Sequence, residues 1–279
     1  MRPLLAAFVL FALSLSCADD PVVEVVSPPP VLHRPDVLGL DGEAEEAALW
    51  LSGELTAPGP LYEAIHDDLA AIRSEYPMVA GDYAPRFTPW WLPSVVGILV
   101  TTELKDKILA HAPNPLDSLN TGLHGVSDDR FSGPYGSLGW QGSIRFAGRL
   151  HPQRLTEFYK TVPGVNNAFV DGPIGDYSNV YPRQIPGGMS YLFRFGFGDC
   201  PAGCEVSDFY YFRRVGEVTE FVGSFRTYFD PYPAWWPEAS TAYCTFEMEH
   251  WGWPYCPWAS TTAPSSPART VMTSASAAP

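Results

Sequence analysis

Basic residues are scarce in this chain of 279 residues. It carries 17 lysines and arginines against 31 aspartates and glutamates, which gives a formal net charge of −14. A surface with this balance repels phosphate backbones and anionic lipid headgroups. The composition therefore argues against a nucleic-acid partner, and it leaves a lipid anchor as the only expected route to a membrane.

Long apolar runs are also missing. The run from Leu4 to Leu15 would span about 18 Å as a helix, well short of the roughly 30 Å hydrocarbon core of a bilayer. Arg2 precedes this run and small residues follow it, an arrangement typical of a cleaved signal peptide. We interpret residues 1–17 as the signal-peptide segment, and we expect the mature chain to lie outside the cytoplasm without a transmembrane helix.

Signatures of catalysis are absent as well. The chain has no G-x-S-x-G nucleophile motif and no cysteine–histidine pair outside the expected disulfides. Any two of the 31 carboxylates could be chosen as an acid–base pair, so no single pair stands out. We predict no catalytic residue and no cofactor, with an enzyme whose site is unrecognised as an alternative.

The end of the leader allows two processing routes. The segment Ser14–Cys17 (SLSC) resembles the bacterial lipobox, and this resemblance implies a lipid anchor on Cys17. The family usually has leucine three residues before the cysteine, whereas here Leu13 lies four residues before it. The alternative is ordinary cleavage after Ala18, with Ser16 and Ala18 as the two small residues.

The other four cysteines lie in the last third of the chain, at Cys200, Cys204, Cys244 and Cys256. In an oxidising compartment an even set indicates two disulfides, for which three connectivities exist. Proximity in the sequence favours Cys200 with Cys204 and Cys244 with Cys256. A four-cysteine zinc site is the main alternative, but the C-x₂-C spacing that it normally uses is not present.

The segment 198–204 (GDCPAGC) is similar to a GDCPxGC stretch of uncharacterised secreted bacterial proteins. Its proline and glycines allow the tight loop that a short disulfide needs. The similarity implies an extracytoplasmic environment and no particular activity.

The chain divides into segments by composition. Residues 18–40 are rich in proline and form a predicted tether, and residues 260–279 a predicted disordered tail. Apolar periodicity predicts a helical pair over 41–77. Residues 87–172 follow the order strand, helix, strand, strand, helix, strand, and 173–259 form a predicted antiparallel β region that ends in an aromatic, cysteine-bearing loop. The predicted fold class is α+β: a split βαβ, ferredoxin-like sheet with a disulfide-stapled antiparallel extension.

Within the central unit, residues 146–171 (FAGRLHPQRLTEFYKTVPGVNNAFVD) resemble the second half of subtilisin-propeptide-type inhibitor modules. The shared features are a strand, a helix, a proline-glycine-valine turn and a final strand. The resemblance implies a peptidase inhibitor or propeptide-like module as an alternative function.

Two groups of residues are candidate binding sites. Four tryptophans could stack on a peptide, a protein or a glycan if they are exposed: Trp235, Trp236, Trp251 and Trp253. The loop that contains Asp171, Asp176 and Asn179 offers oxygen ligands for a hard cation such as calcium, although its spacing does not match an EF-hand. The favoured hypothesis is a non-catalytic, exported envelope protein that binds its partner through the aromatic C-terminal region. The sequence leaves its ligand and oligomeric state open.

Overall fold

The computed structural model describes residues 40–172, 177–198, 200 and 204–251, and of Trp251 only the backbone. Within these ranges the chain forms two antiparallel sheets of four strands each and six α-helices, which is the α+β class predicted from the sequence. No helix among the described residues is long and apolar enough to cross a membrane. The predicted signal peptide, lipidation site Cys17, tether and tail all lie outside the described residues.

The first sheet has the strand order β2-β3-β1-β4, and the second is a meander in the order β5-β6-β7-β8. The strands of the first are β1 (Val95–Val100), β2 (Gly125–Ser127), β3 (Trp140–Phe146) and β4 (Val165–Val170), and those of the second are β5 (Asn179–Ile185), β6 (Gly188–Phe197), β7 (Val206–Val215) and β8 (Val218–Arg226). The helices are α1 (Leu40–Ser52), α2 (Gly59–Glu75), α3 (Thr102–Leu109), α4 (Asp117–Leu123), α5 (Pro152–Tyr159) and α6 (Trp236–Trp251). Short 3₁₀ turns follow α2 at Pro77–Val79 and precede β3 at Gly136–Leu138.

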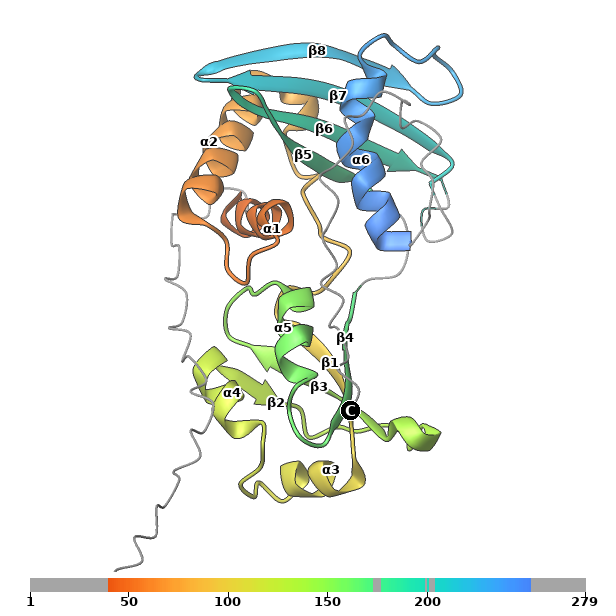
Figure 1. The fold of residues 1–279 in the computed structure, drawn as a ribbon. Helices are drawn as coiled ribbons and strands as arrows, with labels where there is room; N and C mark the ends of the chain where they lie inside the picture. The colour runs from red at the N-terminus through yellow and green to blue at the C-terminus, as the bar shows by residue number, and fades with distance from the viewer. Residues whose placement is uncertain (1–39, 173–176, 199, 201–203, 252–279) are drawn as a thin grey trace, which may run out of the picture.

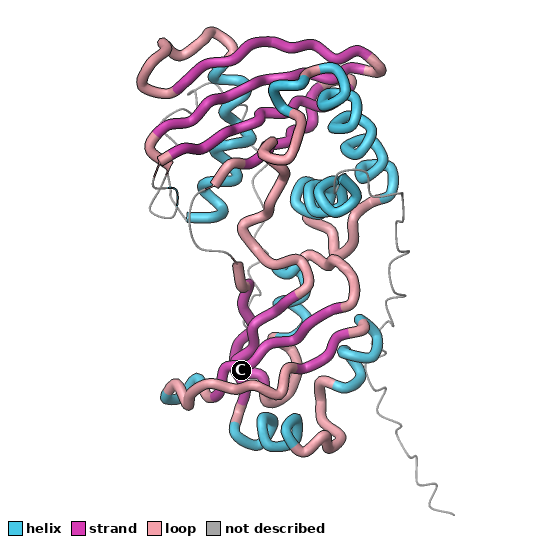
Figure 2. Tube along the Cα trace, turned by 180° about the vertical axis from the view of Figure 1, so that it is seen from behind, coloured by secondary structure: helices cyan, strands magenta, loops and turns pink. Residues whose placement is uncertain are grey.

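Each sheet has its own hydrophobic core. One core joins α1, α2 and α6 to β5–β8, and we call this part the host unit. The other core joins α3, α4 and α5 to β1, β3 and β4, and β2 pairs with β3. We call this part the inserted unit because its sequence interrupts the host unit between α2 and β5. Figures 1 and 2 show the two units at opposite ends of the molecule.

The host sheet is covered by helices on both faces. The Tyr191 hydroxyl donates to Asp68 of α2 at 2.9 Å, whereas the Arg194 guanidinium lies 5.6 Å from the Tyr243 ring centre of α6. Tyr191 and Arg194 are three residues apart on β6, so their side chains point to opposite faces of the sheet. Helices α2 and α6 therefore pack on different sides of the same strands (Figure 1).

A buried ion pair fixes the helical pair that the sequence predicted. Glu43 on α1 accepts two hydrogen bonds from Arg73 on α2, at 2.6 and 2.9 Å, and both side chains are almost fully buried. A Glu43 oxygen also accepts from the Phe87 backbone N–H at 2.8 Å, and Arg73 donates to the Pro85 carbonyl at 2.9 Å. The pair thus joins both helices to the segment that leads into the inserted unit.

The helical segment expected over 103–119, with an interruption near Pro113 and Pro115, is present as α3 and α4, because proline cannot continue an α-helical hydrogen-bond ladder. Two other elements differ from the sequence expectation. Strand β5 was not predicted; it is an edge strand, a position that tolerates its Pro182. The expected C-terminal aromatic loop is wrong over residues 236–251, where the chain forms helix α6 with Pro237 in the first turn, a position that proline tolerates.

The two units meet at a polar junction between α1 and the segment after β3. Arg149 of the inserted unit bonds to Glu45 at 3.1 Å and to Glu46 at 3.0 Å, both on α1. The backbone N–H of His151 donates to the Leu55 carbonyl at 3.0 Å. The His151 ring is buried and lies 5.0 Å from the Trp91 ring centre.

Burial shifts the pKa values at this junction in opposite directions. Burial raises the pKa of Glu46 to about 7, against the opposing effect of Arg149. Burial, together with the nearby Arg154, lowers the pKa of His151 to about 4. Burial thus favours the uncharged form of both side chains.

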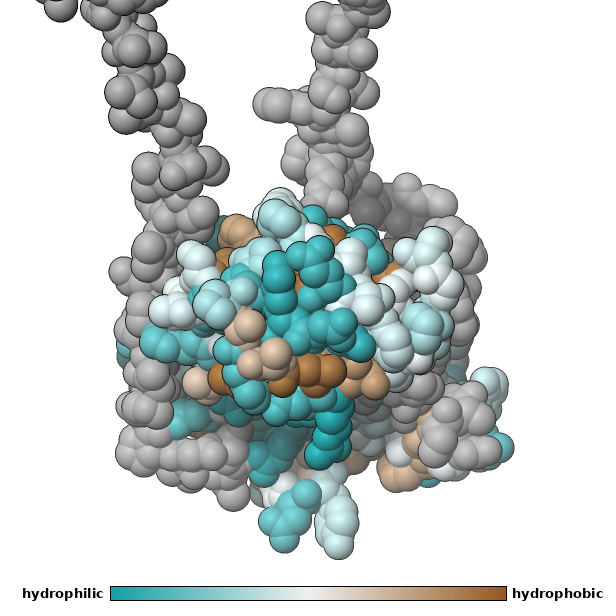
Figure 3. Space-filling view, turned by 90° about the horizontal axis from the view of Figure 1, so that it is seen from below, coloured by the Kyte–Doolittle hydropathy of each residue, from teal (hydrophilic) through white to brown (hydrophobic). Residues whose placement is uncertain are grey.

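The far end of the inserted unit presents a mainly hydrophilic surface. Figure 3 shows the molecule from this end, where a narrow hydrophobic strip is surrounded by hydrophilic residues. Exposed apolar side chains of this unit include Leu109, Val126 and Leu138.

Replacing Glu43 with glutamine is expected to destabilise the protein by about 3–5 kcal/mol, because Arg73 is left buried without a counter-charge. The matched control is Glu103→Gln: this side chain is 78 % exposed and pairs with Lys107 on the surface, so its loss should have a much smaller effect on stability. Chemical denaturation of both variants measures the difference. Equal, small effects would show that the buried pair does not hold the helices.

The junction predicts a specific pH dependence. Because the folded-state pKa of His151 is depressed from 6.5, its contribution is present above pH 6.5 and is lost as the pH falls towards 4. The unfolding free energy of His151→Gln, measured by urea titration, should therefore fall less over this range than that of the wild type, by about 2–3 kcal/mol. The Glu46→Gln variant tests a pH dependence of the opposite sign. Because the folded-state pKa of Glu46 is raised, the unfolding free energy of the wild type should fall as the pH rises from 4.5 to 7. The unfolding free energy of Glu46→Gln should fall less over the same range. Parallel pH profiles for all three proteins would contradict the assignment.

Candidate functional site

The predicted aromatic residues are only partly on the surface. Trp236, at the start of α6, is 4 % exposed and packs into the host core. Trp235 is partly buried and stacks on Tyr211, with ring centres 5.4 Å apart. Trp236 therefore does not meet the condition of exposure, because α6 lays this ring on the sheet. The Trp251 side chain and Trp253 lie outside what the structure describes.

Other aromatic side chains near Trp236 are exposed. The loop between β8 and α6 presents Tyr228 at 88 % exposure, with Phe229 and Tyr232 also on the surface. Tyr228 has a φ of 66°, a left-handed backbone conformation that is uncommon for a non-glycine residue. The aromatic composition of this loop was visible in the sequence, but its position next to α6 was not.

A cavity of about 270 Å³ lies between the host sheet, this loop and α6. We call it the inner cavity. Strands β6 and β7 contribute Arg194, Ser207 and Phe209, and α6 contributes Trp236 and Tyr243. The other lining residues come from the loops at this end of the sheet: Cys204, Glu205, Thr227, Tyr228 and Tyr232.

Arg194 gives the inner cavity a buried cation. Its side chain is on β6, the residue is 4 % exposed, and its Nε donates to the Ser207 hydroxyl at 2.9 Å. Burial raises the pKa of Tyr181 well above its ordinary value, and a hydrogen bond from Arg194 is among the effects that oppose this rise. Arg194 was not singled out by the sequence, because an arginine in the run SYLFRFGF gives no sign that it faces a cavity.

Trp236 places its ring in the same wall. Its indole Nε1 is buried and has no hydrogen-bond acceptor among the described residues. This nitrogen has almost no accessible surface, so a ligand in the cavity could not reach it. The groups that the inner cavity offers are therefore a buried cation and several aromatic rings.

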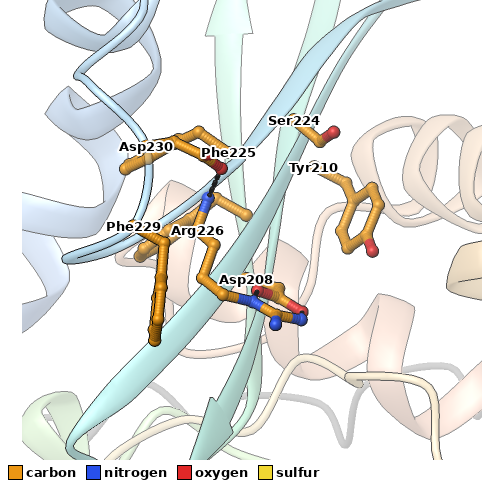
Figure 4. A pocket seen from close by; sticks show the side chains of 8 residues that line it. Asp208, Tyr210, Ser224, Phe225, Arg226, Phe229 and Asp230 are labelled. Carbon is orange, nitrogen blue, oxygen red and sulfur yellow. Dashed lines mark hydrogen bonds and ion pairs between the residues drawn. The ribbon is translucent and has the colours of Figure 1, made fainter.

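A second hollow of about 330 Å³ lies on the other side of the same loop (Figure 4). Arg226 pairs with Asp208 across β7 and β8, and its backbone N–H donates to Asp230 at 2.8 Å. Phe229 and Asp230 come from the loop (Figure 4). The charged groups of this hollow satisfy one another, so it offers a ligand less than the inner cavity does.

The predicted disulfide between Cys200 and Cys204 is present, with Cα atoms 3.9 Å apart. It packs closely on β6: a Cβ added at Gly196 would lie 2.4 Å from the Cys204 Sγ. Cys244, buried on α6, is also disulfide-bonded, and its predicted partner Cys256 lies outside the described residues. Disulfide bonding of these three cysteines overturns the alternative of a four-cysteine zinc site, since zinc ligands are free thiolates. It also indicates an oxidising environment.

The described residues of the predicted cation site take part in local hydrogen bonds. Asn179 is buried at the start of β5, and its side-chain oxygen accepts from the backbone N–H groups of Thr88 and Val180. Its amide is therefore used to hold the chain, while Asp171 accepts from the Gly172 N–H at 3.0 Å. Asp176 lies outside the described residues. The part of the chain that the structure describes holds no group of three acidic, histidine or cysteine side chains suited to a metal ion.

Comparison with known proteins gives no relative for this chain: no protein-family model, no curated protein and no solved structure matches it.

Proposed function

We propose that this protein is a non-catalytic binding protein whose ligand occupies the inner cavity. The observation that carries the proposal is the convergence of Arg194, Glu205 and the exposed tyrosines Tyr228 and Tyr232 around one concave space. Ligand sites are concave, lined mainly by apolar and aromatic side chains, and carry a few placed polar groups. The inner cavity has this composition at a size just below the roughly 300–1,000 Å³ range that is usual for such sites.

The position of the inner cavity also supports binding. Its walls come from strands β6 and β7 and from helix α6, which are regular elements held by the core. Its mouth is formed by the aromatic loop. A rigid wall with a contact loop at the entrance is the usual arrangement of a binding site.

Titration of the full chain with a mixed panel of oligosaccharides and short peptides, followed by tryptophan fluorescence and calorimetry, tests the proposal. We expect saturable binding that Tyr232→Ala weakens by about tenfold, because this ring stands at the mouth. Tyr135→Ala is the control, since Tyr135 is 49 % exposed, like Tyr232 at 50 %, but lies in the inserted unit. Binding that is insensitive to Tyr232, or no binding to any member of the panel, would contradict the proposal.

We further propose that the protein is exported to a bacterial envelope and is lipid-anchored through Cys17. The leader sequence motivates the proposal, and the disulfides support an oxidising compartment. Intact mass of protein extracted from membranes, with and without reduction, is expected to show loss of residues 1–16, an acyl addition on Cys17 and a gain of four hydrogen atoms when two disulfides are reduced. A mature chain that starts at Asp19 without lipid would replace the anchor with free secretion. A full-length chain with free thiols would remove export altogether.

The inserted unit supports a proposal about its fold. Its element order and its antiparallel strand order β2-β3-β1-β4 fit a split βαβ, ferredoxin-like arrangement. Subtilisin-propeptide-type modules, which residues 146–171 resemble, fit the same arrangement. Because one fold serves many unrelated functions, this likeness bears on the architecture of the unit and adds no inhibitory site.

A further inference from the structure

A further cavity, of about 750 Å³, lies in the inserted unit, and we call it the insert cavity. It is formed by the end of α3, by α4 and by β2, at the end of the molecule opposite to the host sheet (Figure 1). Its lining residues come from positions 108–129, whereas those of the inner cavity come from 194–243. Its volume is within the roughly 300–1,000 Å³ that is usual for ligand sites.

Two histidines that line the insert cavity adopt a backbone conformation that normally belongs to glycine. His111 has a φ of 49° and His124 a φ of 53°, both in the left-handed region. After α3, the Ala112 N–H donates to the Lys107 carbonyl at 2.9 Å, which closes the turn around His111. His124 ends α4 as its left-handed C-cap. Each histidine thus takes a position that glycine usually takes at the end of a helix.

The cost of these two conformations indicates a use for the side chains. A left-handed backbone is strained for a residue with a Cβ atom, and glycine would avoid this strain. Both histidines are exposed, so burial of their imidazoles does not offset it. Strained backbone positions of this kind gather at ligand sites. Here two of them lie at the wall of one cavity.

The ionisable side chains of the insert cavity favour a ligand that brings positive charge. Asp117 and Asp129 line the cavity, and none of the described residues that line it is a lysine or an arginine. The Asp117 carboxylate already accepts from the Asn114 side chain at 2.9 Å, whereas Asp129 is exposed on the loop after β2. A carboxylate accepts hydrogen bonds without donating any, and a neutral imidazole has one acceptor nitrogen. The cavity therefore suits a cation with several N–H donors.

Apolar residues of the insert cavity define the rest of the ligand. Ala112 and Val126 belong to its lining, and Val126 is 69 % exposed. Methylene groups can lie along such a surface while a charged end stays in water or with an acceptor, as the stem of a lysine does. The ligand should therefore be a flexible chain of methylene groups that carries amino groups.

We propose that the insert cavity binds a linear aliphatic amine with two or more amino groups. Its ammonium groups donate to the Asp129 carboxylate and to the imidazoles of His111 and His124, and its methylene groups lie along Val126. This site shares no lining residue with the inner cavity, so either site can exist without the other.

Calorimetric titration of the full chain with spermidine, in slightly alkaline buffer, tests the proposal. Spermidine is expected to bind at one site, whereas 1,4-butanediol, which has no charge, and succinate, which has the opposite charge, should not bind. Asp129→Asn should weaken spermidine binding about three- to tenfold, the value of one hydrogen bond. Asp106→Asn is the control and should leave binding unchanged, because this carboxylate is 62 % exposed on α3 but does not line the cavity.

The two histidines have a test of their own. His111→Gly and His124→Gly remove the imidazole but suit the left-handed backbone, so both variants should fold. Each should raise the unfolding temperature by about 2–4 °C and weaken spermidine binding about threefold. A lower unfolding temperature would show that the imidazoles serve the fold, and it would overturn their assignment to a ligand.

Three further outcomes would overturn the proposal. The first is unchanged spermidine binding in both glycine variants. The second is equal weakening by Asp129→Asn and Asp106→Asn, which would show that the net negative charge of the chain alone attracts the amine. The third is no binding of spermidine to the wild type. None of these results bears on the inner cavity, which is tested with other ligands.

Discussion

The buried pair of Glu43 and Arg73 is the constraint on which the arrangement of the host unit depends. It joins α1 to α2 and, through the Phe87 N–H and the Pro85 carbonyl, fixes the segment that leads to the inserted unit. Arg73 also lies 5.8 Å from the Phe193 ring centre of the host sheet. One charged contact thus sets the relation of two helices, a sheet and a connection. Because both charges are buried, removing either one would leave the other unpaired, at a high cost in the free energy of unfolding.

Polar contacts also set the relation between the host helices and the inner cavity. Glu238 of α6 accepts from Tyr211 at 2.8 Å and pairs with Arg213, both on β7. These bonds hold the first turn of α6 against the sheet, and this turn carries Trp236. The wall that Trp236 contributes to the inner cavity is therefore fixed before any ligand arrives, so little conformational entropy would be lost on binding.

The sequence predicted local features better than their combination. The pattern Leu61, Ile65, Leu69 and Ile72 identifies α2 because its period is that of a helix, and the cysteine spacing identifies the Cys200–Cys204 disulfide. Helix α6 was missed because prolines and tryptophans in residues 233–258 outweighed a weak helical period. The inner cavity could not be predicted at all. Its lining residues come from positions 194–243, and only the pairing of β6, β7 and β8 brings them together.

The insertion of β1–β4 between α2 and β5 has a consequence for synthesis. As the ribosome extends the chain, the apolar faces of α1 and α2 emerge long before the strands that cover them, since the whole inserted unit is made in between. The inserted unit contains its own core and can complete it first. Contacts between distant segments form slowly, and apolar surface left uncovered meanwhile favours aggregation. Folding that proceeds from the N-terminus would therefore leave this helical pair uncovered until the meander is available.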